Sequence, residues 1–187
     1  MANHKGSAFG ALGQNIQPGN EAFENLLGSQ LRSIDPDKVL WLEDESRNIG
    51  RVPLPQMLWE NMRQSPLIMI NTSYNARLER LIRDYTNFPK EEILASIVKL
   101  EKRLGFDNCK FATEMCNNDD LAGAAKICLD YYDKAYMYQL HSRFGEDLKG
   151  VNQIDLNTVI VDNCISNIIE ASKTIQLENN GNSYGKE

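Results

Sequence analysis

Three consecutive acids and an arginine follow an apolar run near residue 40, and these residue types together can bind metal and phosphate. The run covers residues 39–42, and the polar residues are Glu43, Asp44, Glu45 and Arg47. A short apolar run is typical of a strand buried in a parallel sheet, and ligands bind beyond the carboxyl ends of such strands. Carboxylates placed there can hold Mg²⁺ and face phosphate oxygens, so we expect catalytic acids here, with Mg²⁺ on Glu43 and Asp44. A core strand followed by a solvated acidic turn gives the same pattern.

A second candidate for ligand contact is the glycine-rich stretch at residues 3–14. It contains His4, Lys5, Gly6 and Ser7. Glycines allow the backbone to approach a ligand closely or to form a tight loop. The stretch is not a Walker A phosphate loop, because the string G-x-x-x-x-G-K-[ST] occurs nowhere in the chain. On composition alone, a plain surface loop is the favoured interpretation.

A row of arginines lies on the helix expected at residues 74–85. Arg77, Arg80 and Arg83 recur every third residue and therefore share one broad face. Guanidinium groups in such a row can clamp a phosphate or an RNA backbone. The commoner alternative is a solvated face on which the arginines pair with Glu79 and Asp84.

Four tyrosines fall in the middle of a long helix expected from residue 121 towards residue 141. Tyr132 and Tyr136 belong to this group, and tyrosine rings can stack on unpaired bases. Tyrosines with this spacing more often pack helices together. The sequence leaves both interpretations open.

Composition limits the classes of function. The 187 residues are 42% apolar with a net charge of −6, which suits one domain with a real core and argues against a general nucleic-acid binder. A local basic face remains compatible with this charge. Four cysteines without zinc spacing and only two histidines argue against a structural metal site. No apolar run has the length of a membrane span and no secretion signal is present, so we expect no membrane partner and a cytoplasmic location.

Apolar strands alternating with amphipathic helices must position these groups, and they predict an α/β fold. We expect a parallel sheet of about three strands, at residues 39–43, 67–70 and 158–161. Helices are expected at about residues 20–31, 56–63, 74–85, 89–104, 106–116, 121–141 and 163–177. An α/β domain would cover residues 1–162, with a helical insertion at about 74–145. A C-terminal helix at 163–177 and a disordered tail at 178–187 would follow.

Six short strings, in the same order, resemble one family, the tRNA 2-selenouridine synthases. They are Asn-His-Lys-Gly-Ser-Ala-Phe-Gly at residues 3–10, Phe-Glu-Asn-Leu-Leu at 23–27, Glu-Asp-Glu-Ser-Arg at 43–47, Arg-Leu-Glu-Arg-Leu at 77–81, Arg-Leu-Gly at 103–105 and Tyr-Tyr-Asp at 131–133. Each string is weak alone, but six in register over residues 2–145 are specific. The chain departs from the family pattern at Lys5, where arginine is usual, and at Lys134, where proline is usual.

The resemblance implies most of a C-terminal P-loop domain, which in this family follows a rhodanese-like domain. The expected sheet is then a partial P-loop NTPase-like sheet whose Walker B segment starts at residue 39, with no Walker A segment. The implied reaction converts wobble 2-thiouridine of tRNA to 2-selenouridine through S-geranyl-2-thiouridine, using geranyl diphosphate and selenophosphate. We expect the chain to be inactive alone and to need the missing rhodanese and Walker A portion in trans.

The resemblance also distributes roles over the candidate residues. Catalysis would fall to Glu43, Asp44, Glu45 and Arg47. Binding of phosphate or substrate would fall to His4, Lys5, Gly6, Ser7, Arg77 and Arg80, and contacts to tRNA would come from Arg83, Tyr132 and Tyr136. Two alternatives remain, a remnant of a P-loop small-molecule kinase and a non-catalytic helical binding fragment.

Overall fold

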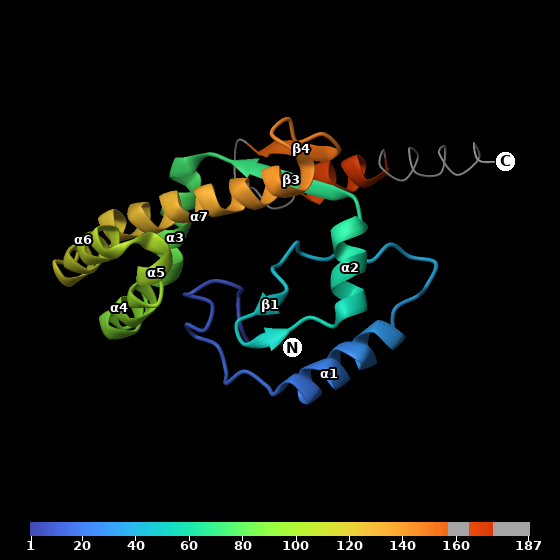
Figure 1. Ribbon diagram of the computed structural model, residues 1–187, viewed down its shortest axis with the longest axis horizontal. Helices are drawn as coiled ribbons and strands as arrows, with labels where there is room; N and C mark the ends of the chain where they lie inside the picture. The colour runs from blue at the N-terminus through green and yellow to red at the C-terminus, as the bar shows by residue number, and fades with distance from the viewer. Residues whose placement is uncertain (157–164, 174–187) are drawn as a thin grey trace. The chain divides into compact units, whose positions relative to one another are not determined.

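The computed structural model describes residues 1–156 and 165–173 of the chain. It divides into two units, the first comprising Met1–Ser65 and Tyr85–Cys128 and the second comprising Pro66–Asp84 and Leu129–Glu187 (Figure 1). The described residues form an α/β protein with two small sheets and a large helical part. No helix in the described ranges has the length and apolar character needed to cross a membrane.

The first unit begins with a loop-rich part built around a small apolar cluster. Its elements are α1 (Asn20–Arg32), β1 (Asn48–Ile49), β2 (Val52–Pro53) and α2 (Gln56–Gln64). Phe23 and Leu27, one turn apart on α1, pack with Val52 and Leu54, as the spacing of an amphipathic helix predicts. β1 and β2 form an antiparallel hairpin. The sequence predicted both helices but only a loop at the hairpin, because strands of two residues give no alternation to detect.

The rest of the first unit is helical and buries its thiols. The helices are α4 (Lys90–Val98), α5 (Glu101–Leu104), α6 (Phe106–Asn117) and the start of α7 (Leu121–Phe144). Their buried residues are Ile93, Ile97, Leu100, Leu104, Cys109, Ala112, Cys116, Ala124 and Cys128. The single helix expected at residues 89–104 is broken after Val98. Gly105 ends α5 with a positive φ of 88°, as a glycine stop predicts.

The second unit contains the parallel sheet. Its elements are β3 (Leu67–Thr72), α3 (Tyr74–Tyr85, the last residue belonging to the first unit), the later part of α7, β4 (Val151–Leu156) and helical residues 165–173. β3 and β4 pair in parallel with Leu67 opposite Val151 (Figure 1). The Ser73 hydroxyl accepts a hydrogen bond from the Ala76 N–H at 3.3 Å, which caps the N-terminus of α3.

The expected strand at residues 39–43 is wrong. The segment is irregular, and its apolar side chains are about half-exposed: Val39 57%, Leu40 41%, Trp41 50% and Leu42 48%. A strand needs a partner for its backbone N–H and C=O groups, and no described strand pairs with this segment. The acidic motif therefore follows a loop and not a strand.

The parallel partner of β3 is a strand that the sequence did not predict. β3 itself confirms the strand expected at residues 67–70 and extends to Thr72. β4 has the sequence Val-Asn-Gln-Ile-Asp-Leu, in which polar residues interrupt the apolar run that would indicate a buried strand. The Asn71 side-chain amide donates to Oδ1 of Asp155 at 2.9 Å across the pair. The strand expected at 158–161 and the tail expected at 178–187 lie outside the described residues.

Candidate functional site

The glycine-rich N-terminal loop and the acidic motif meet in the first unit. Gly6 has a positive φ of 79°, and a Cβ placed on it would lie 2.7 Å from the carboxyl carbon of Glu45. Both the backbone conformation and the close approach therefore require glycine. The contact joins two stretches that the sequence singled out separately.

His4 belongs to this loop, and its ring lies between Gly10 of the loop and Gly50 of the β1–β2 turn. Its Nδ1 accepts a hydrogen bond from the Gly6 N–H at 3.1 Å. A Cβ on Gly10 would lie 2.6 Å from Cε1 of the imidazole, and a Cβ on Gly50 would lie 2.8 Å from Cδ2. Burial, and after it the charge of Lys99, lower the pKa of His4, which favours a neutral ring with Nδ1 as acceptor. The structure thus places this expected phosphate ligand against the loop backbone.

Gln17 ties the N-terminal loop to the β1–β2 hairpin. Its Nε2 donates to the C=O of Ala2 at 3.0 Å and to the C=O of Ile49 at 2.9 Å, and its Oε1 accepts from the Arg51 N–H at 3.1 Å. Every one of these partners is a backbone group, so Gln17 fixes the two segments regardless of their side chains. Sequence reasoning missed Gln17, because nothing in the pattern distinguishes it from the other polar residues of its loop.

Glu45 is the half-buried member of the acidic motif. Partial burial, and then the charge of Glu43, raise the pKa of the Glu45 carboxyl group, while a hydrogen bond from the Ser46 N–H opposes the shift. A raised pKa brings a carboxyl group closer to proton exchange at neutral pH, which suits a general acid or base. Among the three acids, Glu45 has the surroundings that fit proton transfer.

Asp44 and Arg47 are placed differently from Glu45. Oδ1 of Asp44 lies 3.3 Å from a guanidinium nitrogen of Arg63 on α2. That guanidinium group lies over the ring of Trp59, 5.0 Å from its centroid. Arg47 is exposed, and its C=O accepts a hydrogen bond from the Leu54 N–H at 2.7 Å. Asp44 thus points to α2, and the Arg47 side chain is open to solvent.

Lys5 and Ser7 flank Gly6 in the loop. The Lys5 N–H donates to the Gly10 C=O at 3.0 Å, while the Lys5 side chain is exposed. The Ser7 hydroxyl accepts from the Phe9 N–H at 3.2 Å. Ser7 therefore stabilises the turn, and Lys5 is the residue of the loop that offers a positive charge to a ligand.

The acidic motif fits a magnesium ion in part. Within the described residues, no three His, Cys, Asp or Glu side chains come together as a metal site. Mg²⁺ accepts fewer protein ligands, because it keeps several waters and takes one or two carboxylates plus substrate phosphates. Asp44 pairs with Arg63, whereas Glu43 is exposed, so Glu43 is the member of the expected pair whose carboxylate fits such an ion better.

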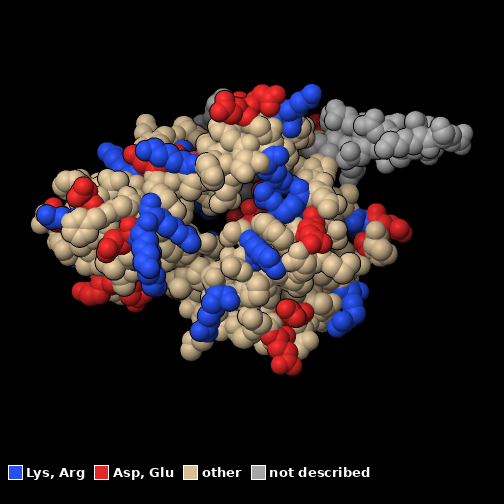
Figure 2. Space-filling view, in the orientation of Figure 1, with Lys and Arg blue, Asp and Glu red and all other residues tan. Residues whose placement is uncertain are grey.

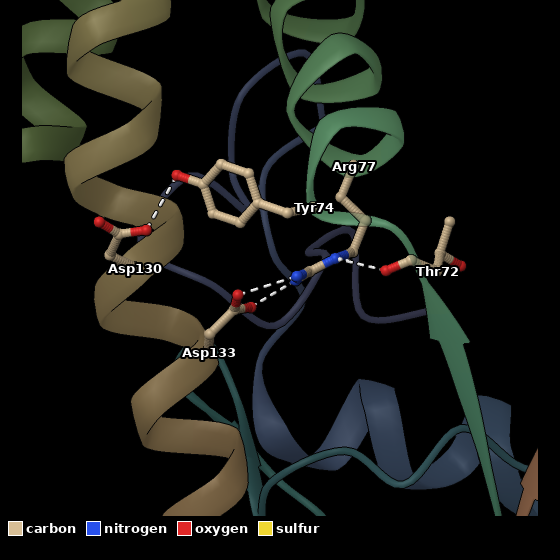
Figure 3. A network of polar contacts seen from close by, with 5 residues as sticks. All are labelled: Thr72, Tyr74, Arg77, Asp130 and Asp133. Carbon is tan, nitrogen blue, oxygen red and sulfur yellow. Dashed lines mark hydrogen bonds and ion pairs between the residues drawn. The ribbon is translucent and has the colours of Figure 1, made fainter. Parts of the chain in front are cut away.

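Arg77 joins α3 to α7 in the second unit (Figure 3). Its guanidinium group donates to both carboxylate oxygens of Asp133, at 2.8 Å for Oδ2, and its Nε donates to the Thr72 C=O at 3.3 Å. Beside this pair, the Tyr74 hydroxyl donates to Oδ1 of Asp130 at 2.9 Å. The forked ion pair connects two of the family strings, Arg-Leu-Glu-Arg-Leu and Tyr-Tyr-Asp. Arg77 is thus bound to protein acceptors that hold α3 against α7.

Arg80 and Arg83 are exposed and share one acid. Nε of Arg80 lies 3.5 Å from Oδ2 of Asp84, and Nε of Arg83 lies 3.7 Å from Oδ1. The expected row of three therefore separates into one packing residue and two surface residues. Figure 2 shows basic and acidic side chains interspersed over the face in view. Positive charge on that face is therefore confined to small groups of side chains.

The tyrosines of α7 differ in exposure. The ring centroids of Tyr132 and Tyr136 lie 6.4 Å apart, and those of Tyr131 and Tyr132 lie 5.2 Å apart in an edge-to-face arrangement. Tyr136 is 60% exposed and Tyr138 is 76% exposed. Tyr132 is therefore partly engaged in packing, whereas Tyr136 and Tyr138 offer more ring surface to a partner.

One family model covers most of the chain. The model described as tRNA 2-selenouridine synthase AAA domain matches residues 1–153. The chain belongs to the tRNA 2-selenouridine synthase family. The resemblance drawn from the six strings is confirmed, and the matched range contains every candidate residue from His4 to Tyr136.

Curated tRNA 2-selenouridine synthases agree with this assignment. The chain is 30% identical over 175 residues to the one from Pseudomonas fluorescens, an alignment covering 77% of this chain and 47% of that protein. It is 29% identical over 180 residues to the one from Marinobacter nauticus, covering 79% and 48%. The chain therefore spans about half the length of these relatives. No solved structure matches it.

Proposed function

We propose that the chain forms part of a transferase that converts the wobble 2-thiouridine of tRNA to 2-selenouridine. The observation that carries the proposal is the family match over residues 1–153, together with relatives named for this product. In the proposed sequence, geranyl diphosphate alkylates the sulfur and releases diphosphate. The selenium of selenophosphate then attacks C2 and displaces geranyl thiolate, and water cleaves the Se–P bond to release phosphate and leave 2-selenouridine. Both donors carry phosphate, so the site must neutralise negative charge.

The contact between Glu45 and the N-terminal loop is the proposed reaction site. Glu45 is the proton-transfer group, because partial burial raises its pKa. Lys5 and Arg47, both exposed, meet phosphate oxygens of the donor. Mg²⁺ held by Glu43 would add positive charge beside the diphosphate leaving group.

The exposed arginines and tyrosines of the second unit are the proposed tRNA contacts. Arg80 and Arg83 neutralise backbone phosphates, and Tyr136 stacks on an unpaired base. Replacing both arginines with Ala should reduce the slope of log affinity against log salt concentration by about 0.7 to 0.9 for each lost phosphate contact. An unchanged slope would assign them to a solvated face.

Residues 1–187 alone are expected to be inactive. They contain no G-x-x-x-x-G-K-[ST] string, which supplies the backbone amides and lysine that normally hold the phosphates. A portion that contains such a loop, joined to the chain or supplied in trans, completes the proposed enzyme. Formation of 2-selenouridine by the 187 residues alone would show that the reaction site lies elsewhere.

A chimera tests the proposed function. The matching region of the Pseudomonas fluorescens relative is replaced by this chain, and tRNA nucleosides from cells without their own enzyme are measured by mass spectrometry. We expect 2-selenouridine from the chimera and a loss with Glu45→Gln, since the amide keeps the shape and removes the charge. Glu114→Gln, at an exposed acid of α6 in the same unit, is the matched control. A folded chimera without product, or full product with Glu45→Gln, would contradict the proposal.

A further inference from the structure

His4 contacts three glycines that belong to two backbone segments, the N-terminal loop and the β1–β2 turn. It accepts a hydrogen bond from Gly6, and its ring lies against Gly10 on one edge and Gly50 on another. Gly10 belongs to the N-terminal loop, whereas Gly50 forms the turn between β1 and β2. The imidazole thus fills the space between the loop and the hairpin.

The protonation state of the His4 ring fits binding to the loop backbone and not binding to phosphate. Nδ1 accepts the Gly6 N–H, so it carries no proton, and the ring is neutral with its proton on Nε2. A neutral imidazole lacks the positive charge that phosphate binding would use. The nearby Lys99 further disfavours the charged form of His4.

The backbone that His4 holds is the backbone that Glu45 touches. Gly6 donates to the imidazole and at the same time lies against the Glu45 carboxylate. Gln17 holds the β1–β2 turn on the other side of the ring, because it binds the backbone of Ile49 and Arg51 on either side of Gly50. A shift of the ring would therefore release Gly6 and change the surroundings of Glu45.

We propose that His4 is a positioning residue for Glu45: its neutral ring, held between Gly10 and Gly50, fixes Gly6 against the Glu45 carboxylate. The value of this placement for catalysis rests on the proposed function, in which Glu45 transfers the proton. The placement itself is a property of residues 1–187 and can be measured without any activity.

The first test uses the unaltered chain. Long-range ¹H–¹⁵N spectra of the histidines distinguish the two neutral tautomers and the imidazolium form. At pH 7 we expect His4 to be neutral with its proton on Nε2. An Nδ1–H tautomer or an imidazolium ring would overturn the proposal, and this outcome does not depend on the folding of any variant.

The second test compares variants at His4. An Asn side chain can place its amide oxygen near the position of Nδ1 and accept the Gly6 N–H, whereas Ala cannot. Hydrogen exchange of the Gly6 amide and the cross-peak between Gly6 and the Glu45 side chain are measured by NMR in each protein. We expect the Gly6 amide to exchange at least about tenfold faster and the cross-peak to be lost in His4→Ala, and both to be retained in His4→Asn. His141→Asn, at the only other histidine, should leave both measurements unchanged.

The outcomes separate the positioning role from the proposed function. If Gly6 exchange and the contact between Gly6 and Glu45 are the same in the unaltered chain and in folded His4→Ala, the positioning role is wrong whatever the chimera does. If the NMR results hold while the chimera makes no 2-selenouridine, the proposed function fails and the positioning role stands. In an active chimera, His4→Ala should lower kcat by at least tenfold with little change in KM for the donor, and His4→Asn should restore kcat.

Discussion

Residues 67–70 and residues 39–42 are apolar runs of equal length, and each leads into polar residues of a candidate site. The first run lies in β3, which pairs with β4 along its whole length from Leu67 to Thr72. The second run has no partner strand in the parts of the chain that the structure describes, and it stays about half-exposed. A partner for the backbone groups therefore decides whether a strand forms, and apolar composition does not suffice.

The polar segments that follow the two runs in the sequence are nevertheless both held by contacts with other parts of their units. At the end of β3, the Thr72 C=O accepts a hydrogen bond from Arg77, which also forms a bidentate ion pair with Asp133. Behind residues 39–42, Asp44 pairs with Arg63, and Glu45 lies against Gly6. Loop contacts can therefore position a site segment without the strand that was expected to carry it.

The largest contrast between the runs is expected in amide hydrogen exchange. Amides of β3 that bond to β4 should exchange at least about 100-fold more slowly than those of residues 40–42, because exchange of a paired amide requires opening of the sheet. Exchange followed by NMR at constant pH gives both rates in one sample. Equal rates would remove the structural difference between the two runs.

The two arginines that hold these segments, Arg77 and Arg63, should contribute differently to the free energy of unfolding. Arg77→Met should lower the free energy of unfolding by about 1 to 2 kcal/mol, because it removes a forked ion pair and a bond to the Thr72 C=O. Arg63→Met, which removes a contact of 3.3 Å to Asp44, should lower it by less than about 1 kcal/mol. Urea unfolding measures both, with Arg80→Met as a surface control. A larger loss for Arg63→Met would reverse the ranking of the two anchors.

A smaller effect is expected from the charge of Glu45. Its pKa is raised on folding, so its contribution to stability is present below the unfolded pKa and is lost as pH rises through the folded pKa. Glu45→Gln should therefore raise the melting temperature at pH 7 and change it little near pH 4. The gain should be about 0.5 kcal/mol or less, since the group is half-exposed. A lower melting temperature at pH 7 would mean that the ionised carboxylate stabilises the loop.

The smallest effect is expected at Trp41 in the unpaired run. Trp41→Ser should change the free energy of unfolding by no more than about 0.5 kcal/mol, because the side chain is half-exposed and no described strand pairs with its segment. Urea unfolding of this variant, followed by circular dichroism, provides the measurement. A loss above about 2 kcal/mol would indicate that the run is buried in solution as a core strand is.

Local sequence patterns predicted most of the helices, although the one expected at residues 89–104 is two helices, α4 and α5. Residues 74–85 were expected as a helix, and α3 covers Tyr74–Tyr85, because its apolar spacing and its Ser73 cap act within a few residues of one another. Gly105 was expected to end a helix and does so. The bounds of α1, α2 and α6 likewise lie within one residue of those expected. Such features depend on neighbours in the sequence, which a pattern contains.

Contacts between distant residues could not be predicted in this way. The pairing of β3 with β4 and the attachment of Gln17 to the hairpin each join segments whose sequences carry no sign of the other. The acidic motif was identified from its residue types, but its contact with Gly6 was not. The arginine row was identified too, yet its division into packing and surface residues depends on Asp133, far along the chain.

The thiols buried between the helices of the first unit have a practical consequence. Burial, and then the neighbouring thiols of Cys109 and Cys116, raise the pKa of Cys128 to about 12. Since the thiolate is the form that attacks a disulfide reagent, these sulfurs react only when the helices separate. After replacement of Cys164 by serine, only the buried thiols remain to be labelled. Their labelling rate would then measure how often these helices open, without any added probe.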